Sequence, residues 1–213
     1  MVDYHSYWEK CWHEENTTEL DRYLECYRVV KREEIDIFKE HQLTKVCDAA
    51  CGFGGYTLAL AVNGFEVYGF DISNTAVEIT KNGLKKYGIE SENVKVASIL
   101  DAGYEDAFFD GVIAHAVIDH LKKLDAVKAL NELVRITREE GLIWMTFDIE
   151  EEEDFEEEFI THEDGTMEYI KGNRDGMLFH PYDWSEIDEL LKGHDIVYRD
   201  KTKRERTVIL KKH

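Results

Sequence analysis

The hydrophobic pattern is most regular between residues 44 and 148, where short apolar runs alternate with stretches of helical periodicity. The runs have the length of buried strands, and the stretches between them carry apolar residues every three or four positions, as amphipathic helices do. This alternation predicts a doubly wound α/β fold with a mainly parallel sheet. The expected strands cover residues 45–50, 65–71, 94–99, 110–117 and 141–148, and the expected helices cover 57–62, 73–87 and 124–136.

The segments on either side of this core differ from it. Residues 1–43 form an aromatic and acidic arm with two expected amphipathic helices. Its stripe of Tyr4, Trp8 and Trp12 is either core packing, which is favoured, or an aromatic lid. Residues 149–181 form an acidic insertion without periodicity, which we expect to be a substrate lid. Residues 182–213 predict a helix near 184–192 and an antiparallel hairpin of 194–199 with 206–211, within one domain over 1–213.

Charge narrows the classes of partner. The chain has 213 residues, with 46 Asp and Glu against 26 Lys and Arg and a formal net charge of -20. Nucleic-acid binders concentrate Lys and Arg, so this charge argues against nucleic acid and acidic membranes. No apolar run reaches the roughly 20 residues of a membrane span, and the start MVDYHSYWEK lacks the features of a secretory signal. We expect a cytoplasmic protein with a small-molecule substrate, whose oligomeric state the sequence does not predict.

Neither the acidic run nor the cysteines indicate a site. Residues 150–158 hold eight acids, and a mobile, solvated run is favoured over a site for a cationic amine or a divalent ion. Cys11, Cys26, Cys47 and Cys51 form no CxxC pair. We therefore expect reduced thiols with no disulfide framework and no zinc site, and we assign no residue as a metal ligand.

The strongest chemical signal is the loop DAACGFGG at residues 48–55, after the first expected strand. A strand that ends in an acid and turns through Gly-x-Gly into a helix offers backbone N–H groups to a polar ligand. Asp71 ends the next strand 19 residues after Gly52 and is placed to accept both hydroxyls of a ribose. A dinucleotide fingerprint would have a third glycine at position 57, where Thr57 stands. The ribose contact suits either a dinucleotide or another nucleoside cofactor.

Three blocks of the core occur in a fixed order: VCDAACGFGGYTLALA with GFDIS, then FFDGVIAHAVIDHL, then ALNELVRITREEGLIWMTF. Together they resemble the class I S-adenosylmethionine-dependent methyltransferases over roughly residues 44–148. The resemblance implies a seven-stranded Rossmann-like sheet in the order 3-2-1-4-5-7-6 with strand 7 antiparallel. It also implies S-adenosyl-L-methionine as the cofactor and S-adenosyl-L-homocysteine as its product.

The resemblance assigns cofactor contacts residue by residue. Asp48, Gly52 and Gly54 would line the methionine portion of the cofactor, and Asp71 would hold its ribose. Ala50 belongs to the same loop and stands where family members usually have glycine. Alanine is tolerated there unless the position needs a positive φ.

The adenine end departs from the family pattern. Ile72 would pack beside the adenine. The family often places an acid after strand three, but Ser98 stands at the matching position, followed by Ile99 and, three residues on, by Asp101. The Ser98 hydroxyl, the Ile99 backbone or the Asp101 carboxylate would contact the adenine amino group.

Two histidines follow the fourth expected strand. In methyl transfer, positioning alone supplies roughly 7 to 11 kcal/mol, and a base is needed only when the acceptor carries a proton of high pKa. His115 follows the strand directly, where family members contact the cofactor and face the substrate, so it is the candidate catalytic residue. The alternative is that its backbone serves the cofactor while its ring fills space. His120 matches a histidine common in the family, for which a structural role is favoured.

Substrate contacts are expected at Tyr7, Trp8, Tyr169, Arg174 and His180, with Arg174 the natural partner of a substrate carboxylate. The family's amino-methylating enzymes of adenine and glutamine carry a Pro-Pro-Tyr element after strand four, where this chain has AHAV. We therefore predict N-, O- or S-methylation of a small molecule. Two alternatives stay open, a noncatalytic S-adenosylmethionine-binding protein and a NAD(P)-dependent oxidoreductase.

Overall fold

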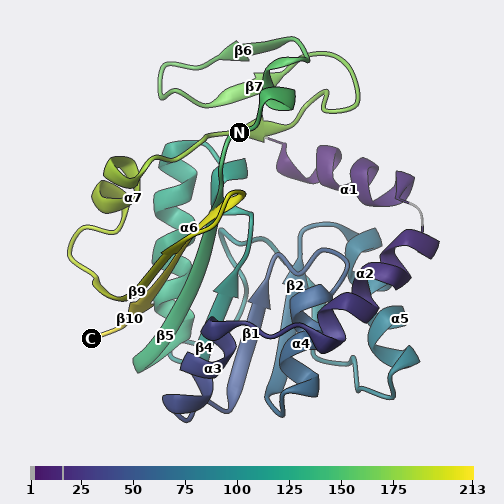
Figure 1. Ribbon diagram of the computed structural model, residues 1–213, viewed down its shortest axis with the longest axis vertical. Coiled ribbons are helices and arrows are strands. Elements are labelled where there is room, and N and C mark those ends of the chain that lie inside the picture. The colour runs from purple at the N-terminus through teal and green to yellow at the C-terminus, as the bar shows by residue number, and fades with distance from the viewer. Residues whose placement is uncertain (1–2, 16) are drawn as a thin grey trace.

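The computed structural model describes residues 3–15 and 17–213, and its centre is a seven-stranded sheet between two layers of helices (Figure 1). The sheet order is β3-β2-β1-β4-β5-β10-β9. β10 is antiparallel to both of its neighbours, and the pairs from β3 to β5 are parallel. The predicted order 3-2-1-4-5-7-6 is thereby confirmed. The strands are β1 (Lys45–Ala49), β2 (Glu66–Asp71), β3 (Val94–Val96), β4 (Phe109–Ala114), β5 (Thr137–Asp148), β9 (Asp195–Lys201) and β10 (Glu205–Lys211).

Both faces of the sheet are buried because successive residues of a strand point to opposite sides. On β4, Val112 joins the core beneath α6 (Lys123–Ile136) and α7 (Trp184–Leu190). Its neighbour Ile113 joins the core beneath α3 (Glu33–Glu40) and α4 (Gly55–Val62). On β5, Met145 and Trp144 divide between the two faces in the same way. α5 (Asn74–Lys86) packs beside α4 and completes the second face.

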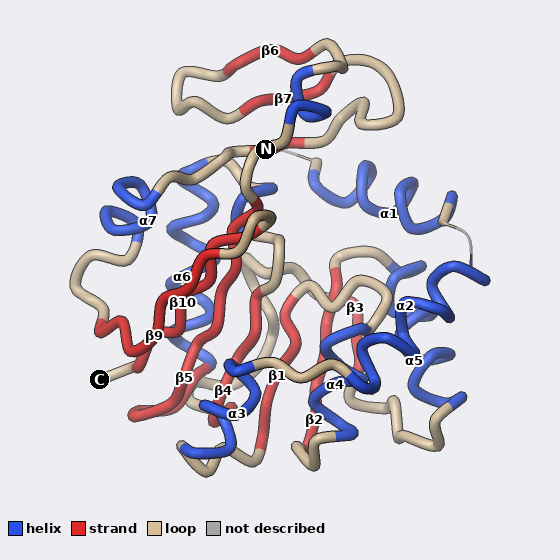
Figure 2. The backbone as a smooth tube through the Cα atoms, in the orientation of Figure 1, coloured by secondary structure: helices blue, strands red, loops and turns tan. Residues whose placement is uncertain are grey.

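The N-terminal arm has three helices where the sequence pattern predicts two. They are α1 (Tyr4–Glu14), α2 (Thr17–Val29) and α3. α3 is short and mostly charged, so its helical period is weak in the sequence, yet Ile35 and Phe38 anchor it in the core. Figure 2 shows α1 set apart from the other helices, beyond one end of the parallel strands.

β5 begins earlier than predicted. The pattern Glu139-Glu140-Gly141 predicts a turn, but these residues belong to the strand. The Glu140 N–H donates to the carbonyl of Lys212 at 2.9 Å, and Glu140 keeps a left-handed φ of 63°. Backbone pairing with the C-terminal segment therefore continues through Glu140 in spite of its left-handed φ.

The insertion forms a small sheet of its own at the same end of the molecule as α1 (Figure 1). It contains the short helix η2 (Glu152–Phe155) and the antiparallel strands β6 (Phe159–Thr161), β7 (Met167–Tyr169) and β8 (Leu178–Phe179). Met167, Tyr169 and Phe179 make its apolar centre. Within residues 3–15 and 17–213, no helix is both long and apolar enough to cross a membrane.

Candidate active site

The loop from β1 into α4 turns through three left-handed residues. Ala50, Gly52 and Gly54 have φ values of 60°, 53° and 85°. Gly54 is also the N-cap of α4. Position 50 therefore does require a positive φ, and alanine adopts it there at a cost of about 1–2 kcal/mol. The small residues let the chain fold closely over the end of β1.

Asp48 lies near the end of β1, is buried, and is held from inside the fold. Its Oδ2 accepts a hydrogen bond from the Thr57 hydroxyl at 2.6 Å. Burial raises the pKa of Asp48 to about 6, despite the opposing effect of that hydrogen bond. Thr57, which stands in place of the third glycine of a dinucleotide fingerprint, thus has a specific partner in the loop.

Asp71 is fixed at the end of β2 by two backbone donors. Gly52 N–H donates to one carboxylate oxygen at 2.9 Å and Ser73 N–H donates to the other at 2.9 Å. The residue is 5% exposed, and burial raises its pKa even though both N–H groups oppose the shift. Each oxygen keeps a second acceptor site, so the carboxylate can take two further hydrogen bonds.

These residues border one cavity of about 280 Å³ at the carboxyl end of the parallel strands. The loops after β1, β2, β3 and β4 supply its floor, and α1 and α2 supply its cover. Of the predicted site residues, nine line the cavity: Trp8, Asp48, Ala50, Gly52, Asp71, Ile72, Ser98, Ile99 and His115. Strand order brings all of these residues except Trp8 together, because parallel strands end at the same edge, and α1 adds Trp8 from above.

α1 covers this cavity through polar anchors and aromatic rings. Glu9 accepts hydrogen bonds from the hydroxyls of Ser73 at 2.6 Å and Thr75 at 2.7 Å, which lie at the start of α5. These bonds lower the pKa of Glu9 to about 2. Tyr4 donates to Asp125 at 2.9 Å at the other end of the helix. The three rings of the stripe therefore line the cavity, and Tyr4 also packs against the core.

Trp12 was not among the predicted site residues, and it contributes an unusual polar atom. Its ring lies so close to Gly52 that a Cβ there would be 2.8 Å from the indole. Trp12 lines the cavity, and its Nε1–H is buried with no acceptor among the described residues. The N–H is available to a ligand oxygen.

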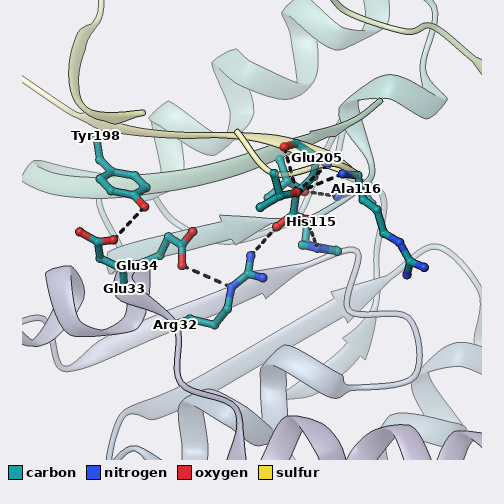
Figure 3. A network of polar contacts seen from close by, with 10 residues as sticks. Arg32, Glu33, Glu34, His115, Ala116, Tyr198 and Glu205 are labelled. Carbon is teal, nitrogen blue, oxygen red and sulfur yellow. Dashed lines mark hydrogen bonds and ion pairs between the residues drawn. The ribbon is translucent and has the colours of Figure 1, made fainter. Parts of the chain in front are cut away.

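His115 belongs to a charged network at the β4 side of the cavity (Figure 3). Its Nε2 lies 3.1 Å from Glu205, whose other oxygen accepts from Arg32 at 2.7 Å. Burial opposes ionisation of Glu205, but His115 and Arg32 prevail and lower its pKa to about 2. The carboxylate can only accept, so Nε2 carries the proton and Nδ1 of a neutral imidazole holds the lone pair.

The network also contains aromatic walls. The Tyr56 ring lies 4.6 Å from the His115 ring and 5.0 Å from the Tyr27 ring. The Arg32 guanidinium lies 5.6 Å from the centre of the Tyr56 ring. No local motif marks Arg32 or Glu205, because they come from the arm and from β10 and meet only through the sheet.

The core also matches a known sequence family. Residues 47–145 match the sequence model of the methyltransferase domain, and they carry the glycine loop, Asp71 and His115 in the sheet order described above. The matched part is just under half of the chain, and it is similar to a methyltransferase domain.

Solved structures share the methyltransferase fold. The PH0226 protein from Pyrococcus horikoshii has 22% identity and a TM-score of 0.69, over 84% of this chain and 87% of that chain. The 1,6-didemethyltoxoflavin-N1-methyltransferase of Burkholderia thailandensis has 16% identity and a TM-score of 0.65, over 85% and 77%. The magnesium protoporphyrin IX methyltransferase of Synechocystis has 16% identity and a TM-score of 0.60, over 100% and 86%. The sequence has no match among curated proteins.

The remaining predicted site residues do not line the cavity. Gly54 lies behind the loop against Thr80. Tyr7 lies on the side of α1 that packs near Gly176 in the insertion. Arg174, predicted to bind a substrate carboxylate, instead pairs with Asp154 at 2.6 Å.

The other two predicted residues of the insertion, Tyr169 and His180, also have polar partners. Tyr169 donates to the backbone of Asp154 at 2.9 Å. His180 lies 3.0 Å from Glu186 and is 4% exposed. Polar partners within the insertion hold Arg174 and Tyr169, and Glu186 of α7 holds His180, so these side chains do not face the cavity.

Proposed function

We propose that this chain is an S-adenosylmethionine-dependent methyltransferase that transfers the methyl group of its cofactor to a small-molecule acceptor. The observation that carries the proposal is that one continuous cavity contains Asp71 at one end and His115 with aromatic rings at the other. Along the sheet, β2, β1 and β4 are successive neighbours. A ligand anchored at Asp71 would therefore extend past the glycine loop toward His115.

The residues present fit the cofactor. Asp71 would accept the two ribose hydroxyls with the oxygen lone pairs that its backbone donors leave free. Ile72, Ser98 and Ile99 would contact the adenine, and the Trp12 N–H would donate to the carboxylate of the methionine portion. S-adenosylmethionine itself supplies an electrophilic methyl group. Gly54, outside the lining, would act by setting the turn into α4.

His115 is proposed as the base on the acceptor side. Its Nδ1 would take the proton that the acceptor loses, and the ionised Glu205 would stabilise the resulting imidazolium, as a carboxylate does beside a catalytic histidine. Arg32 keeps Glu205 ionised and holds it in place. The rest of the rate enhancement would come from holding the acceptor in line with the methyl group, which supplies roughly 7 to 11 kcal/mol.

Several features support a small acceptor. The cavity lies beneath α1 and is walled by aromatic rings, including Trp8, Tyr27 and Tyr56. Such walls suit a flat or partly apolar molecule. Its nucleophile would be a nitrogen, oxygen or sulfur atom that bears a hydrogen. The formal charge of -20 disfavours a nucleic-acid acceptor. Two of the three structural neighbours described above act on ring molecules according to their names.

Calorimetry with S-adenosylhomocysteine tests the cofactor site. We expect the wild-type chain to bind it and Asp71→Ala to lose binding. The control Glu105→Ala, which replaces an exposed acid between β3 and β4 that does not line the cavity, should keep binding. Ligand at 100 times its Kd should stabilise the fold by about 2.7 kcal/mol, which raises Tm by roughly 5–11 °C for a chain of this size. Binding of NAD or NADP instead would refute the proposal.

Screening with labelled methyl donor tests the reaction. Transfer of label to any small acceptor would support methyl transfer, and His115→Gln should lower kcat more than it changes the Kd of S-adenosylhomocysteine. A chain that binds the cofactor but labels no amine, phenol, carboxylate or thiol in a broad screen would be a noncatalytic binding protein.

A further inference from the structure

Three ligand-type side chains meet at the β4 and β5 end of the cavity. Asp119 and His120 lie in the short helix η1 (Ile118–His120), and Asp148 ends β5. One ligand atom from each lies within 4.8 Å of the other two. His120 also lines the cavity, so the cluster borders the proposed acceptor side.

Asp119 has an unsatisfied oxygen in a buried place. The side chain is 0% exposed. One oxygen accepts the Asp148 N–H at 2.8 Å, whereas Oδ1 has no donor among the residues that the structure describes. A buried carboxylate is costly unless a cation or hydrogen bonds compensate it, so this oxygen independently points to a ligand.

His120 is oriented as metal-binding histidines are. Its Nδ1 lies 2.8 Å from the carbonyl oxygen of Leu178. A carbonyl only accepts, so Nδ1 carries the proton and Nε2 of the neutral ring holds a lone pair. The Trp8 and Phe179 rings pack against the imidazole at 5.0 and 5.9 Å. A second hydrogen bond of this kind fixes the tautomer and raises ligand basicity at known metal sites.

The charges around the cluster leave room for a cation. The charges of Asp119 and Glu205 act unfavourably on an ionised Asp148, whereas His115 and His120 act favourably on it. His115 is already paired with Glu205. A divalent ion would relieve the repulsion between the two carboxylates.

We propose that Asp119, His120 and Asp148 bind a divalent transition ion such as Mn²⁺ or Zn²⁺. Tetrahedral ligands about 2.1 Å from such an ion lie about 3.4 Å from one another, so a pair of ligand atoms at the 4.8 Å limit would have to close by about 1.4 Å. One imidazole with two carboxylates favours Mn²⁺ or Zn²⁺ over Mg²⁺ and Ca²⁺, which prefer oxygen ligands. This assignment differs from the sequence analysis, which names no metal ligand.

The proposed role of the ion rests on the proposed function. Three protein ligands leave further coordination positions of the ion open. Because His120 lines the cavity, we place these open positions on the acceptor side. The ion would hold an acceptor that carries an oxygen donor and orient it beside His115. The metal site itself requires neither the cofactor nor the reaction.

Mn²⁺ titration of the full chain, followed by electron paramagnetic resonance, tests the site. We expect one tight equivalent, displaced by Zn²⁺ but not by equimolar Mg²⁺. Asp119→Asn should weaken binding at least tenfold, because the amide oxygen still accepts the Asp148 N–H but the charge is lost. Asp148→Asn is the second variant, should the first fail to fold. The control replaces Glu150, Glu152 and Glu153 by Gln, which removes three charges from the acidic run.

Absence of tight Mn²⁺ binding to the folded wild-type chain would overturn the proposal. So would binding that persists in both aspartate variants, or binding lost only in the acidic-run control, which would indicate adventitious attraction. The titration is run with and without S-adenosylhomocysteine. Failure of cofactor binding would refute the proposed function and leave the metal result intact.

Discussion

The unpaired indole N–H of Trp12 gives a prediction that separates the two ends of the cofactor. In Trp12→Phe an aromatic ring still covers Gly52, but the donor is gone. The free protein should lose no hydrogen bond, since Nε1 has no acceptor among the described residues. A cofactor carboxylate bonded to that N–H would lose one charge-assisted hydrogen bond.

The expected size follows from that single bond. A hydrogen bond to a charged group contributes about 1.5–3 kcal/mol, which corresponds to about a 10- to 150-fold change in Kd. S-adenosylhomocysteine should weaken by this factor, measured by calorimetry. 5′-Methylthioadenosine lacks the amino-acid portion, so its Kd should change far less, and it controls for altered packing. Equal weakening of both ligands, or none for S-adenosylhomocysteine, would refute the assignment of Trp12.

Three further predictions concern the same region. Ala50→Gly should stabilise the fold by up to about 1 kcal/mol in denaturant unfolding, because glycine adopts the left-handed φ without strain but loses more entropy on folding. Glu9→Ala should speed amide hydrogen exchange in α1 and weaken S-adenosylhomocysteine several-fold while leaving exchange in α6 unchanged, since it removes the bonds to Ser73 and Thr75. Asp48 has a pKa of about 6 in the folded protein, above its ordinary value of 3.8. Its ionised form therefore lowers the free energy of unfolding above pH 6, and this loss disappears as pH falls toward 4. Asp48→Asn should therefore be more stable than wild type at pH 7.5, by roughly 3 kcal/mol at most, and equal to it near pH 4; a constant difference across this range would contradict the pKa.

The fold was predictable where hydrophobic period and element length agree. The runs at β1, β2, β4 and β5 are apolar and bounded by glycine or polar turns, so their type and order follow from the sequence pattern. The resemblance supplied the strand order. α3 and the strands of the insertion were missed because they are short or highly charged, and their stability comes from a few buried side chains such as Phe38 and Tyr169. Such contacts leave no local period.

The site was predictable on the cofactor side and less so elsewhere. The loop at residues 48–55 and Asp71 lie at strand ends that topology brings to one edge, so their position in the sequence is sufficient. Glu205 and Arg32 are 173 positions apart, and only the pairing of β10 with β5 places them beside His115. In the insertion, the residue type of Arg174 suggested ligand binding, but a neighbouring acid already satisfies its charge.

The N-terminal arm and the core both contribute to one cavity. None of the residues of α1 is buried, so its docking depends on a few contacts: Glu9 to α5, Tyr4 to α6, Trp8 on His120 and Trp12 on Gly52. Two of these contacts meet residues that the cofactor or the proposed ion would touch. Ligands that bind under α1 therefore add contacts to a weakly held helix, and closure and binding must be thermodynamically coupled. A helix held more firmly by core packing would close the same cavity but would have to break that packing to admit a ligand.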